Sequence, residues 1–150
     1  MYTRRSWREK MDNPNLPKVV DIPPLWQKRC GPGSMLIPSP RQVEALMRAV
    51  PKGRLITVTA IREILAAEHM ASIACPLTTG IFVRIAAEAA EEDARAGKTR
   101  ITPYWRVVRN DGSLNPRFPG GVSRQAERLR AEGHRIVPAK GKHPPRVVAA

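Results

Sequence analysis

The chain has 150 residues, the length of one modest domain with its own core, and no apolar run is long enough to cross a membrane. The formal net charge is +13, distributed as +4 over residues 1–31, zero over 32–96 and +9 over 97–150. This excess favours a polyanionic partner, with nucleic acid first, over the alternative of a basic surface kept for solubility.

The cysteines and histidines do not indicate a metal site. Cys30 and Cys75 lie far apart without metal-type spacing, and the three histidines do not cluster with them. We therefore expect free thiols in a reducing cytoplasm, and neither a metal ion nor another cofactor. The N-terminal run MYTRRSWREKMDNP is basic, but no apolar segment follows it, which distinguishes it from a secretory signal.

Residues 1–38 are rich in proline and charge, and runs such as DNPNLPKVVDIPPLW are typical of loops. The segment is nevertheless too apolar for a free tail. Its apolar side chains are Val19, Val20, Ile22, Leu25, Trp26, Met35, Leu36 and Ile37. We expect an extended basic arm that packs over a domain of residues 39–137, with a sharp bend from Gly31 to Gly33. Residues 138–150 are expected to form a basic C-terminal extension.

A helix is predicted from Ser39 and Pro40, which suit the N-cap and the first helical position. Apolar residues at helical spacing follow, and Pro51 ends the pattern. A second helix is expected after RLIT, with Thr57 or Thr59 as its cap.

The third helix is predicted over TTGIFVRIAAEAAEEDARAG, capped by Thr78 or Thr79 and closed by Gly97. Two consecutive helices with a short joint indicate a helix-turn-helix, a pattern shared with any helical hairpin.

The last third of the chain alternates short elements. YWRVV has strand character and RNDGSLN is a turn. Ser123 is expected to cap a helix that ends at Gly133, and HRIV and RVVAA are expected to form two short strands. The predicted fold class is therefore mostly α with short β-strands.

Five motifs occur in a fixed order, namely VPKGRLIT, the helix pair, TPYWRVV, the turn and glycine pair of RNDGSLNPRFPGG, and LRAEG. This order resembles the C-terminal, DNA-binding domain of the alkylguanine-DNA alkyltransferases, also called methylated-DNA–protein-cysteine methyltransferases. In that family VPxGxVxTYxxIA leads into a helix-turn-helix, and PCHRV, xxDGxLGGYxGG and LxxEG follow. The resemblance covers Val50 to Ile136. It implies a winged helix-turn-helix-like domain that binds double-stranded DNA.

The resemblance also locates the reaction centre. In the family, the Cys of PCHRV accepts an alkyl group from guanine, the His assists through a water, and the Glu of LxxEG orients the His. Here these positions hold Tyr104, Trp105 and Glu132, and Arg106 keeps the Arg of the motif. A phenol with an ordinary pKa near 10 is a poor nucleophile, and an indole has no basic nitrogen. Alkyl transfer by the family mechanism should therefore be absent.

The family's DNA-handling residues are also changed. The Tyr that helps rotate a nucleotide out of the duplex falls at Val58. The Arg that fills the gap corresponds to Arg84 or, in a competing alignment, to Thr79. The run from Ala86 to Ala90 allows close approach to a DNA backbone or, equally, close helix packing.

The sequence is similar to the alkyltransferase-like proteins, which bind alkylated DNA without repairing it and flag the lesion to nucleotide excision repair. We therefore expect a non-catalytic DNA-binding protein. Tyr104, Trp105 and Arg106 would form the lesion pocket, by stacking on a base or, alternatively, by plugging the pocket as core; Arg106 could instead hold the loop. Phosphate contacts are expected from Thr79, Arg84, Lys98, Arg100, Arg109, Arg117 and Arg124. Two other functions stay open, an alkyltransferase with Cys30 or Cys75 as displaced nucleophile and a general interaction module for nucleic acid or protein.

Overall fold

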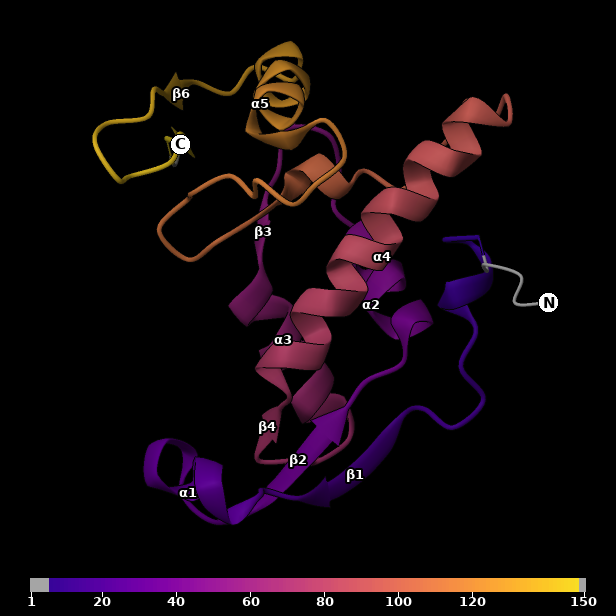
Figure 1. The fold of residues 1–150 in the computed structure, drawn as a ribbon, viewed down its shortest axis with the longest axis vertical. Helices are drawn as coiled ribbons and strands as arrows, with labels where there is room; N and C mark the ends of the chain where they lie inside the picture. The colour runs from indigo at the N-terminus through magenta and orange to yellow at the C-terminus, as the bar shows by residue number, and fades with distance from the viewer. Residues whose placement is uncertain (1–5, 149–150) are drawn as a thin grey trace, which may run out of the picture.

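The structure is a computed structural model that describes residues 6–148. Within this range the chain forms five α-helices, two 3-10 helices and seven short strands in three small sheets (Figure 1). The fold is therefore mixed α/β, and the expectation of helices joined by short strands is confirmed at that level.

The helix predicted at Ser39 is α2, which spans Pro40–Arg48. The Ser39 side chain accepts a hydrogen bond from the Gln42 backbone N–H at 3.2 Å, and the Gln42 side chain accepts one from the Ser39 N–H at 3.0 Å. This reciprocal pair satisfies two backbone donors at the helix start. The predicted cap is therefore confirmed.

Helix α3 spans Val58–Glu68 and is capped by Thr57, whose hydroxyl accepts from the Ala60 N–H at 3.0 Å. Helix α4 spans Pro76–Arg95, and its N-cap is Cys75. The prediction of a Thr78 or Thr79 cap was wrong, because Pro76 already begins the helix and its fixed φ suits the first turn. The helix ends just before Gly97, which adopts a φ of 91° as predicted for a closing glycine.

Helix α4 is the longest element and runs diagonally through the molecule, against α2 and α3 (Figure 1). The four alanines of its small-residue run have no exposed surface, namely Ala86, Ala87, Ala89 and Ala90. Alanine lets two helix backbones approach closely, so this run serves helix packing. The alanines therefore pack against neighbouring elements and are not exposed for close approach to a DNA backbone.

The N-terminal arm is more ordered than the sequence indicates. A short 3-10 helix, η1 (Glu9–Met11), packs on α4, and strand β1 (Lys18–Asp21) pairs antiparallel with β2 (Ser34–Ile37). Strand β2 in turn pairs parallel with β4 (Ile73–Ala74). Helix α1 (Pro24–Cys30) follows β1 and precedes β2 in the sequence. After α1, the chain bends through positive φ angles at Gly31 and Gly33. The arm therefore packs as expected but contributes a helix and two strands.

The segment after α4 pairs with β3, a strand from earlier in the chain. The 3-10 helix η2 (Tyr104–Arg106) precedes β5 (Val107–Val108), which pairs parallel with β3 (Ile56–Thr57). The strand predicted over YWRVV thus begins only at its two valines, because Tyr104 to Arg106 take a helical turn after Pro103. Helix α5 spans Gly121–Ala131, so Ser123 lies inside the helix and its predicted capping role was wrong.

The chain ends in a small antiparallel hairpin. Strands β6 (Ile136–Val137) and β7 (Arg146–Val147) pair as the two final strands predicted from the sequence. The basic extension therefore packs on the domain through β7, where the Val147 backbone N–H donates to Gly112 at 2.9 Å.

Candidate functional site

Tyr104, which the resemblance aligns with a nucleophile, is completely buried. Its hydroxyl donates to the Glu91 carboxylate at 2.6 Å, and its ring meets those of Trp105 and Phe118 edge-on, with ring centres 5.3 Å apart in each pair. Burial, and then the neighbouring negative charge of Glu91, raise the pKa of the Tyr104 hydroxyl well above its ordinary value. The proton therefore stays on the phenol, which cannot act as a nucleophile near neutral pH.

Trp105, which the resemblance aligns with a histidine, is 8% exposed. The Arg128 guanidinium lies 4.4 Å from the ring centre and that of Arg106 lies 5.6 Å from it, both in cation–π range. The indole N–H is buried near the Glu132 carboxylate without completing a hydrogen bond to it. Trp105 is therefore mostly buried and contacts two guanidinium groups, and the little surface it exposes lines a cavity described below.

Arg106 is tied into the fold by four hydrogen bonds. Its Nε donates to both Glu132 oxygens at 2.9 and 3.2 Å, its Nη2 donates to Glu132 Oε2 at 2.6 Å, and its Nη1 donates to the Val50 carbonyl at 2.7 Å. Burial raises the pKa of Glu132, but the hydrogen bonds from Arg106 lower it by more. The pKa of Glu132 is therefore below its ordinary value. Arg106 and Glu132 therefore clamp η2 to the end of α5, and Arg106 holds the loop.

Glu91 is the residue of this site that the sequence did not reveal. It lies on α4, and its carboxylate accepts both from Tyr104 and from Arg128 Nη2, the latter at 2.8 Å. Burial raises the pKa of Glu91, but these two donors lower it more. The run EEDAR does not distinguish Glu91 from its acidic neighbours, because the residues that bind its carboxylate are distant in sequence.

The two cysteines do not replace the lost nucleophile at this place. Cys75 is 4% exposed, and its sulfur accepts hydrogen bonds from the N–H and hydroxyl of Thr78 at 3.5 and 3.0 Å, as part of the α4 cap. Cys30 is exposed on α1. Helix α1 lies at the opposite end of the molecule from α5, against which η2 packs (Figure 1).

The residues predicted to contact DNA differ in exposure and in the elements that carry them. Thr79 has no exposed surface, and its hydroxyl donates to the Cys75 carbonyl at 2.7 Å, which leaves no group for an external contact. Arg84 is exposed on α4, with its guanidinium 5.8 Å from the Trp7 ring centre. Arg117 and Arg124 are exposed before and within α5. The other three predicted residues line two separate cavities.

Lys98 and Arg100 line a cavity of about 490 Å³ between the end of α4, η2 and α5, which we call the basic cavity. Its lining residues are Arg48, Ala94, Lys98, Thr99, Arg100, Ile101, Pro103, Trp105, Arg106 and Arg128. Half of them carry a positive charge, and within the described chain this lining includes no carboxylate.

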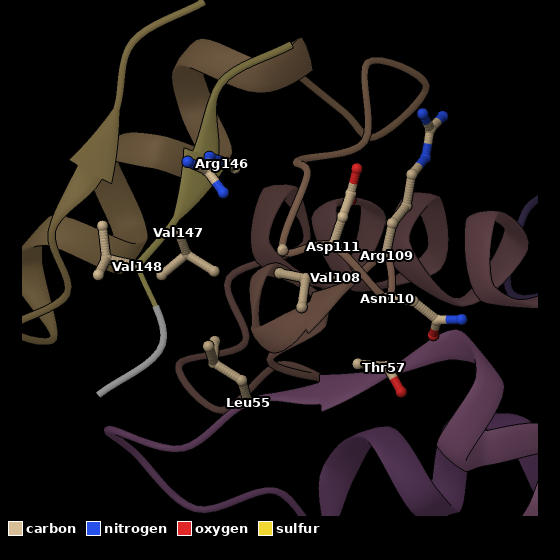
Figure 2. A pocket seen from close by; sticks show the side chains of 10 residues that line it. Leu55, Thr57, Val108, Arg109, Asn110, Asp111, Arg146, Val147 and Val148 are labelled. Carbon is tan, nitrogen blue, oxygen red and sulfur yellow. The ribbon is translucent and has the colours of Figure 1, made fainter. Parts of the chain in front are cut away.

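Arg109 lines a second cavity of about 540 Å³, which Figure 2 shows between three segments. Leu55 and Thr57 reach it from β3, Val108 to Gly112 from β5 and its turn, and Arg146 to Val148 from β7. Its lining includes one leucine, three valines and only two cations, and Asp111 lies beside Arg109 (Figure 2). This cavity is therefore less cationic than the basic cavity.

Over residues 6–148, no group of His, Cys, Asp or Glu is arranged to hold a metal ion, and none of the helices is both long and apolar enough to span a bilayer. Comparison with family models, with characterised proteins and with solved structures gave no match. The resemblance to the alkyltransferases therefore rests on the motifs of the sequence alone.

Proposed function

We propose that this chain is a non-catalytic, alkyltransferase-like protein that binds double-stranded DNA. The observation that carries the proposal is Tyr104, which the resemblance places at the nucleophile position and which is buried, with its hydroxyl donating a hydrogen bond to Glu91. The motifs around it are kept while the reactive pair is lost. This combination favours retained binding without alkyl transfer.

The winged helix-turn-helix is part of the same proposal. Helices α3 and α4 follow each other through the short β4 segment, which suits a helix-turn-helix pair. Arg84 is exposed on the second of these helices and is available for a phosphate or groove contact. The net charge of +9 over residues 97–150 supplies the long-range attraction for a duplex.

Alkylated guanine is the lesion that the resemblance implies, and nucleotide excision repair proteins are the partners it implies. Burial of Tyr104 and of Trp105 supports the plugged-pocket alternative over base stacking. We therefore propose that these two rings pack the former reaction centre, and that contacts to DNA come from the exposed cations.

A titration at fixed salt tests this proposal. The full chain is added to two labelled duplexes that differ only in one alkylguanine, and the variants Tyr104→Phe and Trp105→Phe are measured beside the wild type. Both variants keep an aromatic ring in the core, so that loss of binding would not simply report unfolding. We expect duplex binding by all three proteins, with any lesion preference unchanged by either substitution.

Three other outcomes would overturn parts of the proposal. Loss of a lesion preference in Tyr104→Phe or Trp105→Phe would show that the rings read the base. Transfer of the alkyl group to wild type but not to Cys75→Ala or Cys30→Ala would identify a displaced nucleophile. The absence of duplex binding at low salt would favour the alternative that the chain is a general interaction module for another partner.

A further inference from the structure

Cationic side chains from four separate parts of the chain line the basic cavity. Arg48 comes from the end of α2, Lys98 and Arg100 come from the loop after α4, Arg106 comes from η2, and Arg128 comes from α5. Convergence of like charges from four segments is unfavourable unless carboxylates or a bound anion compensate them. The carboxylates behind the cavity therefore decide whether an anion is required.

Four carboxylates lie against these cations. They are Glu44, Glu91, Asp93 and Glu132. Arg106 and Arg128 each hold one of them closely, at 2.6 and 2.8 Å. The other two are held by Arg8 of the N-terminal arm, at 2.9 and 2.6 Å. Arg48 and Lys98 are left with longer contacts of 3.6 and 3.7 Å to carboxylates that already have a partner.

Only part of the positive charge in the cavity has a close carboxylate partner. Among the five cations that line the cavity, only Arg106 and Arg128 have a carboxylate within 3 Å, so Arg48, Lys98 and Arg100 have no close partner among the described residues. Arg100 forms no ion pair with any described residue, and the side chains of Arg48 and Lys98 are 49% and 63% exposed. Three cations at the mouth of the cavity are therefore free to turn toward a ligand.

We propose that the basic cavity binds a phosphate monoester, either as a free nucleotide or as the terminal phosphate of a DNA strand. Such a group carries close to two negative charges at neutral pH, which would offset the positive charge of Arg48, Lys98 and Arg100. Guanidinium forks such as Arg48 and Arg100 bind phosphate oxygens in pairs, and Lys98 adds a point charge. The volume of about 490 Å³ is that of a small-molecule site, and Ile101 and Pro103 provide an apolar wall for the rest of the ligand.

The first test uses the full chain and small probes, so it does not depend on DNA binding. Inorganic phosphate and a nucleoside monophosphate are titrated calorimetrically, with sodium chloride at matched ionic strength as the blank. We expect saturable one-site binding in the wild type. Removing one charge-assisted contact in Arg100→Gln or Lys98→Gln should weaken binding about tenfold.

Arg54→Gln is the matched control, because Arg54 is also exposed, does not line the basic cavity, and loses the same charge on substitution. We expect its phosphate affinity to stay within about twofold of wild type, since a distant surface charge is screened by salt. The proposal is overturned by wild-type binding no stronger than the salt blank. It is equally overturned by a loss of affinity in Arg54→Gln as large as that in Arg100→Gln.

A second arm identifies the source of the phosphate. Duplexes with a 5′-phosphate and with a 5′-hydroxyl are compared in the wild type and in Arg100→Gln. A preference for the phosphorylated end that Arg100→Gln removes assigns the cavity to DNA termini. Equal binding of both ends, with the nucleotide still bound, assigns it to a free ligand. Phosphate binding without any duplex binding would refute the DNA-binding function but would support the phosphate site in the basic cavity.

Discussion

The Arg106–Glu132 pair should be among the costliest polar contacts of the domain to break. Their side chains are only 13% and 8% exposed, and three short hydrogen bonds join them. In Arg106→Ala the Glu132 carboxylate would remain buried with its main partner removed. The Val50 carbonyl would lose its donor as well.

The expected loss follows from the burial of the pair. Removing one partner of a buried ion pair costs about 3–5 kcal/mol, and the residual exposure places Arg106→Ala near 3 kcal/mol. For a chain of this length each kcal/mol lowers the melting temperature by about 2–4 °C, so we expect a decrease of about 6–12 °C. Calorimetry or thermal circular dichroism measures this decrease directly.

Arg109→Ala is the matched control. Arg109 lies three residues later, is exposed and has no carboxylate partner among the described residues. Its loss should change stability by less than about 0.5 kcal/mol. Arg106→Ala and Arg109→Ala have the same net charge, so a difference between them reports the clamp rather than charge.

The pH dependence gives an independent check. The pKa of Glu132 is lowered in the folded protein from its ordinary value of 4.5. A lowered carboxyl pKa stabilises the fold fully above the unfolded value, and this stability is lost as the pH falls through the folded value. The stability difference between wild type and Glu132→Gln should therefore be largest near pH 7 and should shrink below about pH 4.

Two results would refute this reasoning. One is an Arg106→Ala melting temperature within about 2 °C of that of Arg109→Ala, which would mean that the clamp carries little stability. The other is a normal melting temperature combined with weakened duplex binding, which would make Arg106 a DNA contact.

Three further predictions concern other parts of the fold. Tyr104→Phe should lower stability by about 1–3 kcal/mol in chemical denaturation, because a hydrogen bond to a charged group is lost while the ring packing stays. Gly112→Ala should destabilise the domain by more than Gly53→Ala: both have a φ of 85°, but only at Gly112 would a Cβ fall 2.7 Å from a backbone oxygen of β7. Equal melting temperatures for these two variants would contradict the close approach of β7. Ser39→Ala should cost about 1 kcal/mol in the same assay, and no change would contradict its capping role.

Two helix caps could be predicted from local sequence, whereas the strand pairing of the arm and one further cap could not. Ser39 and Thr57 were predictable as caps because a cap depends on residues within one turn. The arm strands β1 and β2 were not predictable, because β2 is held by β4, which lies more than 30 residues later and is only two residues long. Cys75 was missed as a cap because cysteine is not among the preferred cap residues.

The candidate site shows the same division. The resemblance directs attention to Tyr104 and Trp105, and that they replace reactive residues stays a prediction. Their burial depends on Glu91 and Arg128, which are brought together from α4 and α5 only by the tertiary fold. The basic cavity was only half predicted, because Arg48 and Arg128 come from helices with no charge pattern that marks them.

The central claim is that the protein binds duplex DNA and performs no alkyl transfer. It is tested most directly by saturating the full chain with a duplex whose alkylguanine carries a labelled alkyl group, then separating protein from DNA. We predict a complex that forms and weakens with rising salt, and label that remains on the DNA after denaturation. Label recovered on the protein, or no complex at low salt, would contradict the account.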